Sequence, residues 1–340
     1  MNNIIYAIGN DPYCLWENDI NAAARSFLRT IDHDYFRYIA ERSSVDLEDP
    51  VKGMRAATSM RLALFHGGET LFLLIGALLQ APRCPHAWVG QCSTGELRMV
   101  LDGINTGQPF LVQNTRISNV SWHEISKEIL TRYAPEAVGL SAAIESFAKF
   151  WELLSLNHTD HSSIDEYNSL KHGFRVAHGG FEVMIGKHAV GSTPPTQQEM
   201  ESLGSSKWGA TFRVIKKFDN DVKGSRSRQS ILTAVNWDAT AVLASLHLVA
   251  DSIGNVVTYL GMLSGLTEFS FRLPHPDTFQ AASKRVDLQS LSIPMAPSVA
   301  RSTTKEQLTI ELKKTCAKRL VRALKDAVRI RQAAIGSNSS

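Results

Sequence analysis

The sequence contains few cysteines and only short runs of apolar residues. Its four cysteines among 340 residues are too few and too scattered for a disulfide framework. Roughly 18 or more uninterrupted apolar residues are needed to span a bilayer, and the longest apolar stretches, 71–79 and 239–266, are shorter than this or broken by polar side chains. The first residues also lack the positive segment and apolar core of a secretory signal. We therefore expect a cytoplasmic protein without a membrane span, in which both stretches form buried helices.

Three motifs of common enzyme classes are also missing. The chain has no Walker loop, no Gly-x-Gly-x-x-Gly after a strand and no Gly-x-Ser-x-Gly. P-loop nucleotide hydrolysis and α/β-hydrolase chemistry therefore lose their main support. The chain is 44% apolar and 20% charged, so it can bury a sizeable core, which excludes disordered and collagen-like classes.

Apolar residues recur every three or four positions in several segments, the period of one helix face. The pattern predicts helices over 16–39, 54–79 and 140–154, a long buried helix over 237–263 and a last helix over 304–333. We expect helical packing throughout the N-terminal half.

Capping residues predict one more helix and the start of the long one. Ser163 stands three residues before Glu166, the spacing of a capping box, and Gly173 is placed to end the short helix that follows. Asn236 or Asp238 is expected to cap the long helix.

Between residues 174 and 236 the apolar pattern changes to a period of two. The segments on either side of Gly179-Gly180 predict a tight antiparallel hairpin, and 209–218 and 230–237 predict a second pair of strands. The fold class we expect is α+β, mainly a helical bundle with a small antiparallel β-sheet inserted at about residues 174–236. The regions, which together are expected to form one compact domain, are 1–173, 174–236 and 237–340.

Polar residues gather at the end of the short helix. Asn168 and His172 share one of its faces, and Lys171 and Arg175 lie close to His172 in the sequence. Histidine is the side chain best able to transfer a proton near neutrality, and the cations suit a phosphate-bearing substrate. The alternative is an ordinary solvated face of a surface helix.

Two short motifs resemble those of the HEPN superfamily. One is Asn-x-x-Lys-His at 168–172, which follows an aromatic helix, and the other is Arg-x4-His, from Arg61 to His66. The resemblance covers residues 16–173. It implies a helical bundle, often dimeric, that acts on RNA as a metal-independent endoribonuclease, or a binding or accessory module where the motif is lost.

The resemblance also implies roles for individual residues. His66 or His172 would transfer a proton beside cations that stabilise the phosphate. The partner would be RNA, the protein could form a homodimer, and no cofactor or metal is expected. The alternative for the first motif is a buried His66 bonded to Glu69, with Arg61 at the rim. The candidate catalytic residues are His66, His172 and Arg61, and the candidate substrate-binding residues are Asn168, Lys171, Arg175 and Glu69.

Other polar groups have simpler explanations. His247 and Asp251, four apart on the long apolar helix, form a candidate acid-base pair but are expected to satisfy each other. Two further groups offer metal ligands without a recognised spacing, so we expect no metal site. These groups are His158, Asp160, His161, Asp165 and Glu166, and Cys84, His86 and Cys92.

Positive charge is concentrated near the C-terminus. Residues 305–331 hold nine Lys or Arg and three Asp or Glu, whereas the whole chain has a net charge of +3. The apolar stripe of this helix includes Leu308 and Leu312 and is expected to pack on its own domain, with nucleic acid or an anionic membrane as alternative partners. A second functional hypothesis is therefore a non-catalytic binding or scaffold protein, which uses the polar cluster and this basic helix to contact a protein partner.

Overall fold

The computed structural model shows a mixed α+β protein in which helices predominate, as the sequence predicts. Two compact units can be distinguished: unit 1 comprises residues 1–212 and 234–291, and unit 2 comprises residues 213–233 and 292–340. Whether the chain forms one compact domain stays a prediction. The described residues are 2–132, 139–172, 175–186, 196, 200–218, 226–268, 271–286, 288–295, 304–315, 318, 319, 322 and 325.

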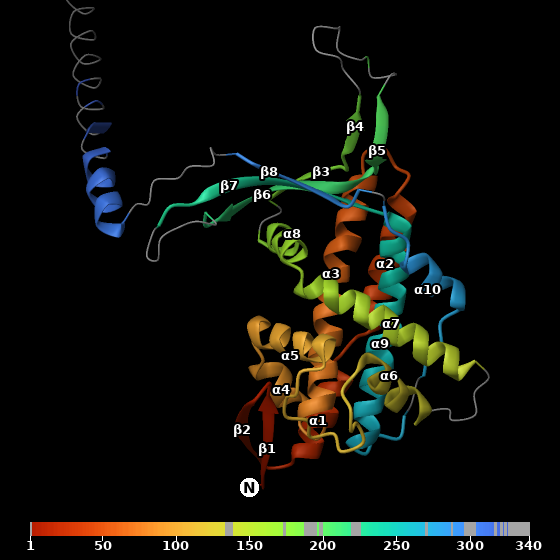
Figure 1. Ribbon diagram of the computed structural model, residues 1–340. Coiled ribbons are helices and arrows are strands. Elements are labelled where there is room, and N and C mark those ends of the chain that lie inside the picture. The colour runs from red at the N-terminus through yellow and green to blue at the C-terminus, as the bar shows by residue number, and fades with distance from the viewer. Residues whose placement is uncertain are drawn as a thin grey trace, which may run out of the picture. The chain divides into compact units, whose positions relative to one another are not determined.

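Helices make up most of unit 1 (Figure 1). They are α1 (Ile20–Arg29), α2 (Asp34–Asp46), α3 (Gly53–Gln80), α4 (Pro85–Gln91), α5 (Thr94–Thr106), α6 (Trp122–Thr131), α7 (Leu140–Thr159), α8 (His161–Lys171), α9 (Ala239–Leu263) and α10 (Pro276–Ala282). The strands are β1 (Asn2–Ile8), β2 (Asp11–Glu17), β3 (Val176–His178), β4 (Glu182–Ile185), β5 (Glu201–Ser205), β6 (Trp208–Lys216), β7 (Gln229–Trp237) and β8 (Ser290–Pro294).

The two longest helices, α3 and α9, lie side by side at the centre of unit 1 (Figure 1). Asp238, one of the two expected caps, accepts a hydrogen bond from the Ala241 N–H at 2.9 Å and so begins α9. Each helix is long and apolar enough to cross a membrane by length and composition alone. However, 72% and 78% of their most apolar windows are buried within the protein, so both are the buried helices that the sequence predicts.

Local patterns predict several helices well and one badly. The expected helices over 54–79 and 140–154 are confirmed as α3 and α7, although α7 continues to Thr159. The expected helix over 16–39 is wrong: its start belongs to β2, and the rest divides into α1 and α2. Asp19 caps α1, and the chain leaves the helix after Arg29 before α2 begins at Asp34.

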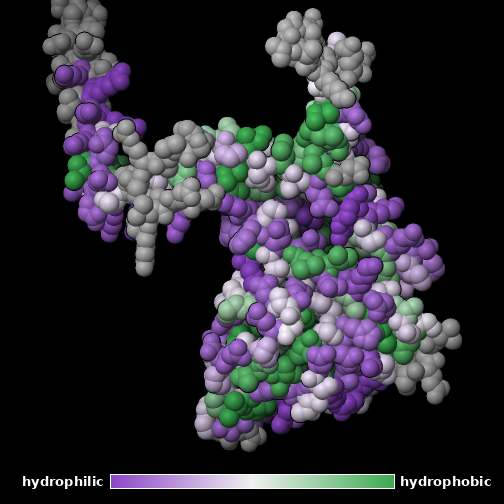
Figure 2. All heavy atoms as spheres, viewed as in Figure 1, coloured by the Kyte–Doolittle hydropathy of each residue, from purple (hydrophilic) through white to green (hydrophobic). Residues whose placement is uncertain are grey.

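The N-terminus is an antiparallel hairpin that the sequence analysis missed. β1 and β2 pair from Asn2 opposite Glu17 to Ile8 opposite Asp11, and Gly9 occupies the turn with a φ of 61°. Inward-facing Tyr6 and Ile8 are buried, whereas Ile5 and Trp16 are exposed on the outer face. Figure 2 shows apolar side chains gathered on the surface in this part of unit 1.

Strand pairing corrects the expected hairpin at Gly179-Gly180. β3 pairs with β6 and β4 pairs with β5, so the two segments beside these glycines do not pair with each other. Glycine is needed here because another part of the backbone approaches closely. A Cβ at Gly180 would collide with the Ser206 carbonyl, and a Cβ at Gly209 would collide with the Val235 carbonyl. The second expected pair is confirmed as β6 and β7, which are neighbours in the order β3-β6-β7-β8.

The basic C-terminal helix belongs to unit 2. Residues 305–315 are helical, and Leu308 and Leu312 are exposed. The remaining residues of the expected apolar stripe, Cys316, Leu320 and Leu324, lie outside the described residues. Packing of this stripe on its own domain therefore stays a prediction.

A glycine in α3 controls the packing of α4, and this gives a stability prediction. Gly76 faces the fully buried Trp88 ring, which a Cβ at position 76 would overlap. Gly76→Ala is expected to lower the free energy of unfolding by about 1–3 kcal/mol, the usual cost of overpacking. Urea denaturation followed by circular dichroism measures this loss.

The control lies on α4 itself. A Cβ at Gly90 meets nothing within 4 Å, so Gly90→Ala should leave stability unchanged or raise it slightly through helix propensity. Equal denaturation midpoints for the Gly76 and Gly90 variants would contradict the packing argument.

Candidate functional site

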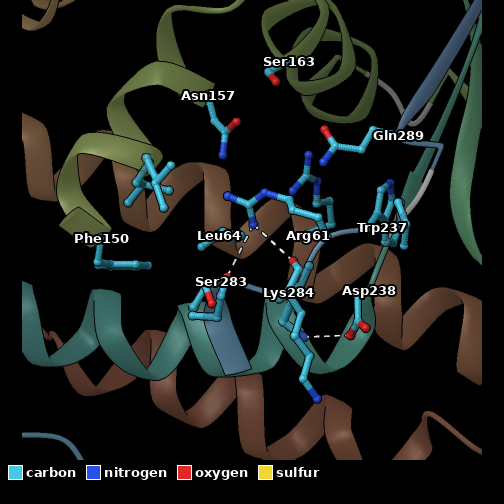
Figure 3. A pocket seen from close by; sticks show the side chains of 18 of the residues that line it. Arg61, Leu64, Phe150, Asn157, Ser163, Trp237, Asp238, Ser283, Lys284 and Gln289 are labelled. Atoms are coloured by element: carbon cyan, nitrogen blue, oxygen red, sulfur yellow. Dashed lines mark hydrogen bonds between the residues drawn. The ribbon is translucent and has the colours of Figure 1, made fainter. Parts of the chain in front are cut away.

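Unit 1 contains a cavity of about 530 Å³, within the range of small-molecule sites. Its walls come from α3, α7, α8, β7, α9, α10 and the segment 283–290. Figure 3 shows Phe150 and Trp237 on opposite sides of the view, with Asn157 and Ser163 on the side of α7 and α8. The pocket therefore gathers residues that are distant in the sequence.

The start of α8 forms one wall of the pocket, and its cap differs from the expected one. Asp160 is the capping residue and accepts a hydrogen bond from the Ser163 N–H at 2.9 Å. The expected capping box between Ser163 and Glu166 is therefore wrong. Glu166 lies one turn further into the helix, where its side chain is free to face α3.

Glu166 forms a buried ion pair with Arg61 of α3. The Arg61 Nε and Nη2 atoms each lie 2.8 Å from a different carboxylate oxygen of Glu166, so the pair is bidentate. The side chains of Glu166 and Arg61 are 2% and 19% exposed. Burial opposes the charge of Arg61, but the Glu166 carboxylate outweighs it and raises the Arg61 pKa. Arg61 also stacks on Phe65, with Cζ 4.7 Å from the ring centroid.

A second arginine lines the same pocket without a carboxylate partner. Within the described part of the chain, the side chain of Arg285 bonds only to main-chain carbonyls, those of Lys284 at 3.2 Å and Ala282 at 3.5 Å. Its residue is exposed rather than sealed in the core. Partial burial and the nearby charge of Arg61 lower the Arg285 pKa. Lys149 and Lys284 are the other cations among the lining residues.

The rest of the lining mixes apolar side chains with amides and hydroxyls. The large apolar side chains come mainly from α7 and β7, and Phe279 of α10 packs edge-on against Phe147 with ring centroids 5.1 Å apart. Asn157 and Gln289 add amide groups. The apolar lining residues with large side chains are Leu64, Phe150, Leu153, Leu154, Val235, Trp237, Val242, Phe279 and Val286.

Three of the residues predicted from the sequence lie around Tyr167 at the α3–α8 interface. His66 is exposed and meets Tyr167 edge-on, with ring centroids 5.6 Å apart. The Tyr167 hydroxyl donates to Glu69 at 2.9 Å, and the Lys171 Nζ lies 5.1 Å from the Tyr167 ring centroid. The alternative of a buried His66 bonded to Glu69 is wrong, because His66 is exposed and Glu69 is bonded by Tyr167. Partial burial, with a contribution from Lys171, lowers the His66 pKa.

The other predicted residues divide between the end of α8 and the pocket. Asn168, His172 and Arg175 are exposed, and the Asn168 carbonyl accepts from the His172 N–H at 3.1 Å and from the Arg175 guanidinium at 3.5 Å. Arg61 alone of the seven lines the pocket. Positions 61 and 66 are about 140° apart around a helix, so Arg61 and His66 face different surroundings.

The other groups considered from the sequence have structural roles. Arg37 bonds both His247, at 3.1 Å, and Asp251, so these two residues are held by a third rather than by each other. His158 is buried against Phe72, and burial lowers its pKa to about 4. The described residues hold no cluster of three or more His, Cys, Asp or Glu placed to bind a metal.

Sequence reasoning missed most of the pocket. Asn157, Trp237 and Arg285 carry no motif, and Arg285 lies in an irregular segment between α10 and β8. Glu166 was the one sequence signal of the pocket. Its carboxylate lies within a helix, so it could bond to a side chain of another element instead of capping its own helix. Comparisons with protein-family models, with curated proteins and with solved structures found no match.

The Arg61–Glu166 pair gives the second stability prediction. Glu166→Gln leaves the Arg61 charge buried without a counter-charge and is expected to lower the free energy of unfolding by about 3–5 kcal/mol. The double variant Arg61→Met with Glu166→Leu removes both charges and should lose less. Urea denaturation of both variants tests this order.

Glu145→Gln is the matched surface control. Its side chain is 72% exposed and lies 4.0 Å from His123, so its loss should cost below about 1 kcal/mol. If Glu166→Gln is no more destabilising than Glu145→Gln, the pair does not hold α8 to α3 in the way described.

Proposed function

We propose that this chain is a non-catalytic binding protein whose pocket in unit 1 takes a small organic ligand. The observation that carries the proposal is a cavity of about 530 Å³ that combines large apolar side chains, among them Phe150 and Trp237, with charged and polar groups. Its volume lies within the range of small-molecule sites, in which apolar side chains hold a ligand and polar groups orient it. No histidine or cysteine is among the described lining residues, so the serines there have no adjacent imidazole of the kind that activates a nucleophile.

Binding without chemistry fits the state of the pocket carboxylates. Asp160 and Asp238 cap α8 and α9, and Glu166 is bonded to Arg61. Each carboxylate thus has a structural partner, and none is poised as a general base.

The proposal predicts binding of an apolar fluorescent probe, N-phenyl-1-naphthylamine. The wild-type protein should bind it with a rise in probe fluorescence. Asn157→Trp, which places a bulky ring at the pocket wall, should weaken binding about tenfold or more by filling the space. A fluorescence titration measures both affinities.

Leu156→Trp is the control for that titration. Leu156 is the preceding residue of α7, is 48% exposed and is not part of the pocket lining. It should bind the probe as the wild type does. Equal affinities for wild type and Asn157→Trp would reject the pocket as the binding site.

A second candidate function is an HEPN-like action on RNA, with the homodimer that the resemblance implies. The observation in its favour is an exposed His66 with a lowered pKa, beside Tyr167 and near Lys171. A neutral imidazole suits a general base, and a lysine suits a phosphate. In this proposal Lys171 or Arg175 stabilises the phosphate, because Arg61 is already bonded to Glu166.

The second candidate predicts that single alanine variants reduce RNA cleavage. His66→Ala or His172→Ala should lower the rate of cleavage of a single-stranded RNA by about 10²–10⁴, the usual contribution of a general acid or base. His123→Ala, at an exposed position of α6, serves as the control. Unchanged cleavage in both test variants rejects these roles.

A further inference from the structure

Arg285 is a cation of the pocket that pairs with no carboxylate of the described residues. Its side-chain partners among those residues are two main-chain carbonyls, at 3.2 and 3.5 Å. Carboxylates and phosphates match the planar fork of donors of a guanidinium group. The absence of such a partner in the described pocket leaves these donors available to a ligand.

None of the acidic residues in the described lining is placed to supply that partner. Both oxygens of Glu166 are bonded to Arg61. Asp160 accepts from Ser162 and Ser163, and Asp238 accepts from the first turn of α9. The described lining residues include four Lys or Arg and three Asp or Glu, so positive charge exceeds negative charge by one among them.

The surroundings of Arg285 strengthen its preference for an anion. The nearby Arg61 repels it electrostatically, and an oxyanion between the pocket donors would relieve that repulsion. Asn157 and Gln289 also line the pocket and can add neutral donors. Aromatic and aliphatic side chains, among them Phe150 and Trp237, complete the lining.

We propose that the pocket selects an amphipathic ligand, in which a carboxylate or phosphate group binds Arg285 and an apolar body packs between Phe150 and Trp237. This inference rests on the proposed function and adds the chemical class of the ligand. Its selectivity comes from Arg285, since the apolar walls alone do not distinguish an acid from the corresponding alcohol.

The experiment is displacement of bound N-phenyl-1-naphthylamine by three compounds with the same eight-carbon chain. These are octanoate, octyl phosphate and octan-1-ol. In the wild type at least one anion should displace the probe at a concentration about tenfold or more below that of the alcohol. Comparison of octanoate with octyl phosphate distinguishes a carboxylate ligand from a phosphate ligand.

Two variants assign the selectivity to Arg285. Arg285→Gln should bring the anions and the alcohol to similar potency, while Arg285→Lys should retain part of the preference. Arg42→Gln, at an exposed position of α2 outside the pocket, should behave as the wild type. The thermal unfolding midpoint of each variant shows that it is folded.

The outcomes separate this inference from the function on which it rests. Equal potency of the alcohol and both anions in the wild type, or an anion preference that persists in Arg285→Gln, overturns the inference while the pocket still binds the probe. Failure of the wild type to bind the probe overturns the proposed function and the inference together.

Discussion

The ion pair between Arg61 and Glu166 is the interaction on which the arrangement of polar groups in unit 1 depends. It joins α3 to α8 through two hydrogen bonds, beside an apolar cluster of Phe65, Tyr167 and Leu170. Glu166 faces the pocket, and the next residue, Tyr167, faces His66. The Arg61–Glu166 pair therefore lies between two polar regions, the pocket and the group around Tyr167. It also uses the one deeply buried carboxylate of the pocket, which leaves Arg285 without a balancing charge among the described residues.

The sequence predicts those elements whose signals are local. The apolar period of three to four residues in α3 and α7 and the cap at Asp238 are properties of short segments, and the structure confirms them. The N-terminal hairpin was not predicted because residues 2–17 were considered only as a possible secretory signal. The break between α1 and α2 was hidden because the apolar residues of both helices fit one helical spacing. The glycines at 179 and 180 suggested a turn, whereas the φ of 122° at Gly179 and the close approach of the Ser206 carbonyl to Gly180 explain them.

The candidate site was less predictable because it depends on packing between distant segments. The sequence placed His66, Glu69 and Lys171 in one hypothesis, and all three do lie around Tyr167, which that hypothesis did not include. The same hypothesis grouped Arg61 with them, yet the turn of the helix directs it into the pocket. Nothing local distinguishes Arg285 from the other arginines, because its proposed role rests on the lack of a carboxylate partner among the described residues.

The span of chain that builds the pocket has a further consequence. Its walls include residues from Arg61 to Ser290, so a contiguous fragment ending before the segment 283–290 lacks one wall entirely. A ligand that binds only the folded state stabilises that state by mass action. Ligand binding would therefore stabilise the contact between the segment 283–290 and helices formed from the first half of the chain. The protease resistance of that segment would rise as ligand fills the pocket. Expression of the chain as shorter recombinant fragments would separate residues that line the pocket together.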